Sequence, residues 1–319
     1  EARAQEVASE AFATGARNDY RHFICWPAVL VGSACELALR HGIETGYTQR
    51  LIRHNGIVPS ARAVALDDWP WPIRIRTLGA FSILVNGEPP PSGRKQRKVP
   101  LRLLQRLIAG GGRGVREQEI SDDLWPESDG DEANANLAIN LVRLREMLQV
   151  NCIERKGGRL TLDDRQVWID VWALDRALGQ HDASAGEEKD PRAGTEWRPE
   201  QIRALYRGPF LGQEEENTWS LAMRKRLQGA LAGYIVKQVT ISLRDKRYDD
   251  VDAWCECGLL VDDTVEEFYR GLMQNRLVAG DLIEVEKVYR RCEAVLRAKL
   301  HLQPGAKTRE IHRQGMRQT

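Results

Sequence analysis

The segment LWPESDGDEANANLAINLVRLREML, residues 124–148, decides how the middle of this chain folds. After an Asp-Gly-Asp start signal at residues 129–131, four leucines recur at helical spacing: Leu137, Leu141, Leu144 and Leu148. Because this spacing brings them onto one side of a helix, that side is expected to face a hydrophobic core.

The same helix carries a second stripe. At about 100° per residue, Asn136, Ile139 and Arg143 lie together, away from the leucines, and Asn140 lies at the edge of their stripe. A short amide and a guanidinium on an exposed helix can hydrogen-bond base edges in a major groove. A solvated surface without a ligand fits the same pattern. The sequence around the helix is therefore needed to distinguish a DNA-binding face from an ordinary surface.

The composition is that of a globular protein with two or three domains, since 319 residues contain 42% hydrophobic and 29% charged residues. The net charge of +1 does not predict nucleic-acid binding, so any positive field must come from local clusters. Six scattered cysteines indicate buried free thiols in a reducing cytoplasm, and no metal spacing or cofactor motif occurs. The longest apolar run, residues 23–34, contains Pro27 and is too short to span a membrane.

The first domain is expected at residues 1–68. Residues 24–42 predict one helix ending at Gly42, and residues 44–54 predict another ending at Asn55-Gly56. The pair fits either the last unit of a helical repeat or a simple helical cap. Pro70 and Pro72 prevent a helix from continuing, so a domain boundary is placed before them. The start at Glu1 instead of Met suggests upstream domains in a longer chain.

The second domain is expected at residues 69–172. Residues 73–79 and 81–87 are rich in β-forming residues, and Asn86-Gly87 favours a tight turn. Helices follow at residues 100–109 and 117–125, and the opening segment supplies the third. Residues 153–162 then predict a hairpin. Basic residues gather before the first helix, at Arg94, Lys95, Arg97 and Lys98, and around the hairpin tip, at Arg155, Lys156 and Arg159.

This order of sheet, three helices and hairpin resembles the OmpR/PhoB type of winged helix-turn-helix. Leu124-Trp125 matches the "LW" that closes the second helix of that family, and Arg143-Leu144-Arg145 with Leu148 matches its "RLR..L". The resemblance implies that the third helix enters the major groove and that the hairpin, or wing, reaches the minor groove or backbone. Glu146 departs from the family, which commonly has a basic residue there.

The third domain, residues 173–319, is expected to be all helical. A helix is predicted at 219–243, a loop at 181–195, and a weak repeat relates Tyr248 to Leu282, the tetratricopeptide spacing. The segments LYRGPFL at 205–211, EEFYRGLM at 266–273 and YRRCEAVLRAKLHLQPGAKT at 289–308 resemble the bacterial transcriptional activator domain of SARP and AfsR-like regulators. The amino-terminal segment is similar to the junction in large MalT-like regulators.

The fold class expected is therefore α+β, a winged helix followed by a tetratricopeptide-like activator domain. If the family geometry carries over, Asn136, Ile139 and Arg143 face base edges, and Asn140 and Arg145 lean toward phosphates, although Arg145 fits an internal ion pair equally well. The wing cations Arg155, Lys156 and Arg159 would supply affinity that does not depend on sequence, although charged turn tips are also common without a ligand.

The main hypothesis is a cytoplasmic transcriptional regulator that binds double-stranded DNA. By resemblance, its activator domain would contact RNA polymerase or a second copy of the chain. The alternative is a protein-interaction scaffold whose winged helix docks protein. An enzyme is not expected, because the six histidines are dispersed and no nucleophile motif is present.

Overall fold

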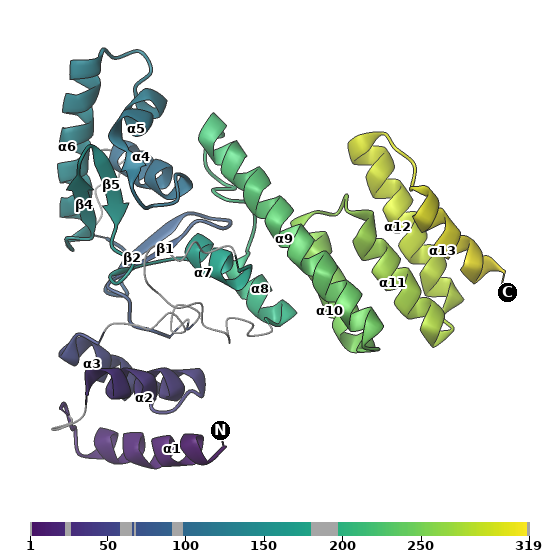
Figure 1. Ribbon diagram of the computed structural model, residues 1–319, viewed down its shortest axis with the longest axis horizontal. Coiled ribbons are helices and arrows are strands. Elements are labelled where there is room, and N and C mark those ends of the chain that lie inside the picture. Colours follow the sequence, from purple (N-terminus) through teal and green to yellow (C-terminus); the bar gives the residue numbers. More distant parts are fainter. Residues whose placement is uncertain are drawn as a thin grey trace. The chain divides into compact units, whose positions relative to one another are not determined.

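The computed structural model describes residues 2–22, 27–57, 66, 68–90, 98–179 and 197–317. The chain divides into two compact units, one of residues 1–76 and 82–169 and the other of residues 77–81 and 170–319 (Figure 1). The domain boundary expected at 172/173 lies close to this division. Several predicted features fall outside the described residues, namely the basic residues Arg94, Lys95 and Arg97, the loop at 181–195, and Cys25.

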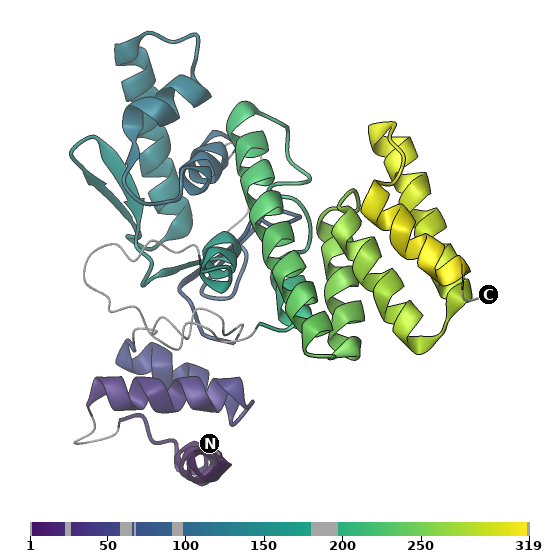
Figure 2. The same cartoon turned by 45° about the vertical axis from the view of Figure 1, so that its right-hand side comes forward.

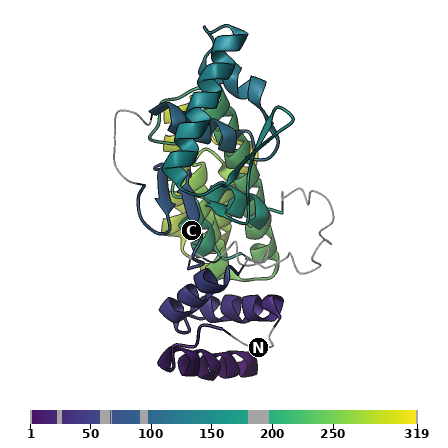
Figure 3. The same cartoon turned by 90° about the vertical axis from the view of Figure 1, so that its left-hand side faces the viewer.

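The chain begins with three helices, α1 (Ala2–Arg17), α2 (Ala28–Arg40) and α3 (Thr45–Asn55). Helix α1 packs on α2, as Figure 3 shows, and α2 packs on α3. The predicted end of α3 is confirmed, because Gly56 follows it in the left-handed conformation with φ of 57°. The Tyr47 hydroxyl donates to the carbonyl of Tyr20 at 2.7 Å, which ties α3 to the segment after α1.

A three-stranded sheet with the order β2-β1-β6 follows. Strand β1 (Ile73–Arg76) pairs antiparallel with β2 (Ser82–Val85) and parallel with β6 (Val167–Ile169). The tight turn predicted at Asn86-Gly87 is confirmed by φ values of 52° and 91°, and Val85 and Glu88 exchange backbone hydrogen bonds across it at 2.7 and 3.0 Å. The pairing of β6 beside β1 was not predicted, because its partners are distant in sequence.

The next part is built of three helices and a second sheet. It contains α4 (Lys98–Ala109), β3 (Val115–Arg116), α5 (Glu117–Leu124), α6 (Gly130–Leu148), β4 (Ile153–Lys156) and β5 (Arg159–Leu162). The strands pair in the order β3-β5-β4, and α6 packs against α4 and α5. The predicted succession of three helices and a hairpin is confirmed, although α4 begins at Lys98, two residues before the expected start at Pro100.

The second unit is mainly helical in its described residues. Its helices are α7 (Asp170–Ala177), α8 (Pro199–Leu205), α9 (Thr218–Arg244), α10 (Tyr248–Val261), α11 (Glu266–Ala279), α12 (Leu282–Leu300) and α13 (Ala306–Met316). Figure 2 shows α9 to α13 side by side, and each helix from α9 to α12 contacts the next. Helices α10 and α12 begin at Tyr248 and Leu282, the two residues that the predicted repeat aligns.

A buried carboxylate holds residues 77–81 in the second unit. Asp170, which is 0% exposed, accepts hydrogen bonds from the Thr77 backbone and hydroxyl at 2.7 Å each and from the Leu78 backbone at 2.8 Å. The Val171 backbone donates a fourth at 2.9 Å. Burial raises the pKa of Asp170, and these four donors act in the opposite direction. The carboxylate therefore fixes the first turn of α7 and the loop before β2 together.

Candidate nucleic-acid interface

Helix α6 is fixed by a cap and by a buried stripe. The Asp129 carboxylate caps its first turn by accepting from the backbone N–H of Glu132 at 2.8 Å, and Gln149 ends the helix in the left-handed conformation with φ of 55°. The predicted leucine stripe is confirmed, because all four side chains are at most 2% exposed: Leu137, Leu141, Leu144 and Leu148. Because these leucines hold one side of α6 in the core, the opposite side of the helix points away from it.

That opposite face is open in part. Ile139 is 49% exposed, Arg143 is exposed and Asn136 is half-buried. Within the described residues, the Arg143 guanidinium has no hydrogen-bond or ion-pair partner. A guanidinium that no carboxylate satisfies keeps all its donors available to a ligand. Of the predicted base-contacting residues, Ile139 and Arg143 are thus clearly accessible.

The structure places two other predicted residues differently. Asn140 is only 6% exposed, its amide N–H donates to the carbonyl of Asn136 at 2.8 Å, and its Oδ1 is buried without a partner. Arg145 donates to the carbonyl of Ile153 at 2.9 Å and therefore links α6 to β4. Asn140 is thus not free to lean toward phosphates as the resemblance implied. Arg145 makes an internal contact, as its alternative expected, but with a backbone carbonyl instead of a carboxylate. The stripe model treats each helical position alone, whereas contacts with neighbouring elements decide how far each of these side chains is covered.

The wing also differs from the expectation. Arg155 makes two hydrogen bonds of 2.7 Å with the carboxylate of Glu117, whose side chain is 10% exposed. This carboxylate raises the pKa of Arg155 and satisfies its guanidinium. Arg159 donates to the carbonyl of Gly114 at 2.7 Å, while Lys156 is exposed and has no partner in the described part of the chain. Lys156 is the wing cation most available to phosphates.

Sequence reasoning missed two residues here. Val142 is 53% exposed and lies three positions after Ile139, on the same open face. The helical spacing was visible in the sequence, but an exposed valine gives no chemical signal by itself. Glu117 was placed on a helix without a role, because its partner Arg155 follows 38 residues later.

The ends of α6 carry negative charge. Asp129, Asp131 and Glu132 are exposed around its amino end, and Glu146 is exposed near its carboxyl end. Carboxylates repel phosphates, so these ends disfavour contact with a nucleic-acid backbone. The uncharged and cationic positions between them form the central part of the face.

The described residues also bear on metal ligation, membrane spans and cysteines. Among the described residues no group of three or more His, Cys, Asp or Glu side chains is arranged to hold a metal ion. In the same part of the chain no helix has the length and apolar character needed to cross a bilayer. Five cysteines are buried and free, as predicted: Cys35, Cys152, Cys255, Cys257 and Cys292.

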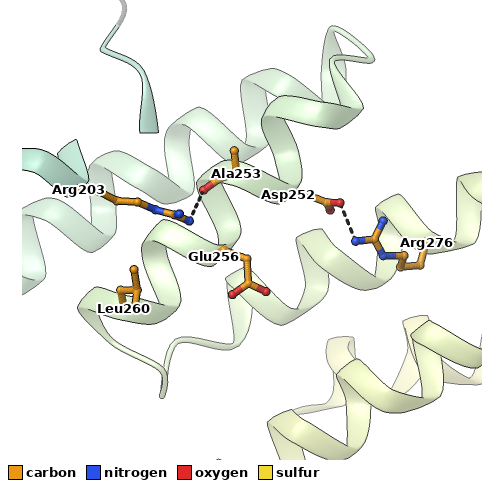
Figure 4. Close-up of a pocket in the computed structure, with 6 residues that line it drawn as sticks. All are labelled: Arg203, Asp252, Ala253, Glu256, Leu260 and Arg276. Carbon is orange, nitrogen blue, oxygen red and sulfur yellow. Dashed lines mark hydrogen bonds and ion pairs between the residues drawn. The ribbon is translucent and has the colours of Figure 1, made fainter. Parts of the chain in front are cut away.

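One shallow groove lies in the second unit, with a volume of about 480 Å³ (Figure 4). Its wall includes Arg276, which pairs with Asp252 at 2.6 Å, and Arg203, which donates to the carbonyl of Ala253 at 3.4 Å. The charges in this groove largely satisfy each other. It therefore offers a weaker case for a ligand than the open face of α6.

Comparisons with known proteins bear on both units. Among solved structures, Mycobacterium tuberculosis EmbR in complex with a low affinity phosphopeptide matches with a TM-score of 0.53 and 17% identity, over 78% of this chain and 66% of that chain. The chain thus spans slightly under two thirds of the EmbR chain, and a likeness at this identity shows a shared fold. No curated protein matches. Residues 169–314 match the family model of the bacterial transcriptional activator domain, and over this range the chain is similar to a domain of transcriptional activators.

Proposed function

We propose that this chain is a sequence-specific DNA-binding transcriptional regulator that acts as an activator in the cytoplasm. Residues 69–172 would form an OmpR-type winged helix-turn-helix, with α6 in the major groove and the β4–β5 wing against the minor groove or backbone. Residues 173–319 would form the tetratricopeptide-like activator domain. Its partners would be RNA polymerase, a second copy of the chain, and upstream domains of a longer polypeptide.

The observation that carries this proposal is the guanidinium of Arg143, which has no partner among the residues that the structure describes. It lies on the open face of a helix whose opposite side is fixed by four buried leucines. An arginine in this position can donate two hydrogen bonds to the O6 and N7 atoms of guanine. Lys156 on the adjacent hairpin, exposed and without a partner in the described ranges, supplies a cation for the backbone.

Binding of the full chain to duplexes selected from a random library tests the proposal. Arg143→Ala should lower specific affinity by about 1 to 3 kcal/mol and relax the preference at one base pair. Lys156→Ala should weaken selected and random duplexes alike and reduce the salt slope by about one. Arg309→Ala and Lys237→Ala are matched controls, because both side chains are exposed in the second unit and have no partner in its described residues.

The proposal fails if Arg143→Ala binds selected and random duplexes with unchanged affinities. It also fails if the full chain selects no duplex, or if affinity does not fall steeply between two salt concentrations, since phosphate contacts release counterions.

A second function is a scaffold whose winged helix docks protein. The exposed apolar side chains of Ile139 and Val142, together with the carboxylate of Glu146, favour it. In that case the same measurements would give weak, sequence-independent DNA binding, and α6 variants would weaken the binding of a protein partner instead.

A further inference from the structure

Two large apolar side chains occupy the centre of the open face of α6. Ile139 is 49% exposed and Val142 is 53% exposed, although burying either would stabilise the fold. Helical geometry separates these positions by about 4.5 Å along the axis, close to the base-pair rise of about 3.4 Å in DNA. Arg143 follows directly and lies four residues after Ile139, on the same face.

The charges around this pair restrict what it can contact. Asp131, Glu132 and Glu146 are exposed at the two ends of α6 and disfavour phosphates there. Between them, the only charged side chain from 133 to 144 is that of Arg143. The face therefore has a cationic and apolar centre, which suits the floor of a major groove, where base edges are presented.

Thymine is the base that displays an apolar group in this groove, its C5 methyl. We infer that Ile139 and Val142 are specificity-determining residues that contact thymine methyl groups on neighbouring base pairs, beside a guanine read by Arg143. The inference rests on the proposed function and adds the base preference of the same site. The preferred duplex then contains thymines on adjacent pairs next to a guanine.

A protein partner is the competing occupant of this pair. A stable protein interface buries about 800 Å² on each partner, far more than two side chains offer. The other apolar residues beside the pair are two small alanines, Ala135, which is exposed, and Ala138, which is half-buried. The remaining neighbours include the charged side chains of Arg143 and Glu146, so the apolar area stays small. Two side chains of the size of Ile139 and Val142 are large enough to contact one thymine methyl group each.

The test uses the full chain and the duplex that it selects from a random library. Each thymine is replaced in turn by deoxyuridine, which removes only the C5 methyl, and Kd is measured for the natural chain, Ile139→Ala and Val142→Ala. At two neighbouring positions deoxyuridine should weaken the natural chain about fourfold, which corresponds to about 0.8 kcal/mol for a methyl-sized group. One of these losses should disappear in Ile139→Ala and the other in Val142→Ala.

Val278→Ala is the matched control, because Val278 is 62% exposed in the second unit and its removal should leave every deoxyuridine effect unchanged. Replacing the neighbouring guanine by 7-deazaguanine, which lacks N7, should weaken the natural chain but not Arg143→Ala. Thermal unfolding verifies that the two alanine variants fold, as expected for exposed positions.

The inference is overturned if a duplex is selected but no deoxyuridine changes Kd by more than twofold, or if the losses persist in both alanine variants. If Val142→Ala leaves DNA affinity intact and weakens a protein contact, the pair serves the scaffold. If no duplex is selected at all, the proposed function itself fails.

Discussion

Both oxygens of the Glu117 carboxylate accept a hydrogen bond of 2.7 Å from the guanidinium of Arg155, so that the first turn of α5 holds the wing strand β4. The backbone N–H of Glu117 also donates to the carbonyl of Gly158, in the wing turn, at 2.9 Å. These three hydrogen bonds fix the hairpin relative to the helices. Arg155 therefore positions the wing, and Lys156 beside it stays open.

Replacing Glu117 by Gln should lower the free energy of unfolding by about 1 to 2 kcal/mol, because the charged partner of Arg155 is lost from a mostly buried position. Glu119→Gln is the control, since Glu119 pairs with Arg116 where both side chains are exposed, and it should cost less than about 1 kcal/mol. Urea denaturation measures both. Equal losses would mean that the Glu117 pair is an ordinary surface contact.

Arg143 and Arg145 should behave in opposite ways although they are two residues apart. Arg145→Ala removes the donor to the carbonyl of Ile153 and should cost about 1 to 3 kcal/mol of stability, with little change in DNA affinity. Arg143→Ala should leave stability within about 0.5 kcal/mol and weaken specific DNA binding. Parallel denaturation and binding curves compare them. If Arg145→Ala made the DNA affinity less dependent on salt concentration, Arg145 would contact a phosphate after all, as the resemblance implied.

Cysteine reactivity should depend on unfolding. Burial raises the pKa of Cys35 and Cys292 to about 12 and that of Cys152 to about 11, and it also raises the pKa of Cys255 and Cys257. Because the thiolate is the reactive form, these five thiols should react with Ellman's reagent at pH 8 only after denaturation. Rapid labelling of any of them in the native chain, identified by peptide mass, would contradict this.

The docking of α13 on α12 should weaken in acid. His312 stacks on Tyr289 with 4.0 Å between ring centroids and hydrogen-bonds to Glu286. The hydrogen bonds from His312 and then Arg290 hold the pKa of Glu286 below its usual value. The ionised carboxylate therefore stabilises the folded state at pH values above the pKa of glutamate in the unfolded chain. This stabilisation is lost as the pH falls through the lower pKa that Glu286 has in the folded chain.

Glu286→Gln tests this directly. The natural chain should be more stable than the variant at pH 6, and the difference should shrink toward pH 3. Thermal unfolding at several pH values measures it, with Glu284→Gln as the control, because Glu284 pairs with Lys287, whose side chain is exposed. A difference that does not depend on pH would exclude the ion pair as its cause.

The sequence by itself determined the order of the helices and strands in residues 98–162 and the buried side of α6. The leucine stripe of α6 and the Asn86-Gly87 turn follow from periodicity and from backbone preference, which act over a few neighbouring residues. The two exposed base-contact candidates, Ile139 and Arg143, could be placed for the same reason.

Only the tertiary structure decided which polar groups are already satisfied. Arg155 finds Glu117 from another element, Arg145 finds the Ile153 carbonyl, and Asn140 is covered by packing. A long charged side chain has many possible partners of similar energy, and the choice depends on distances between elements that local sequence does not encode. The parallel pairing of β6 with β1 joins residues 73–75 to residues 167–169. It could not be predicted, because local sequence does not encode which distant strands lie side by side.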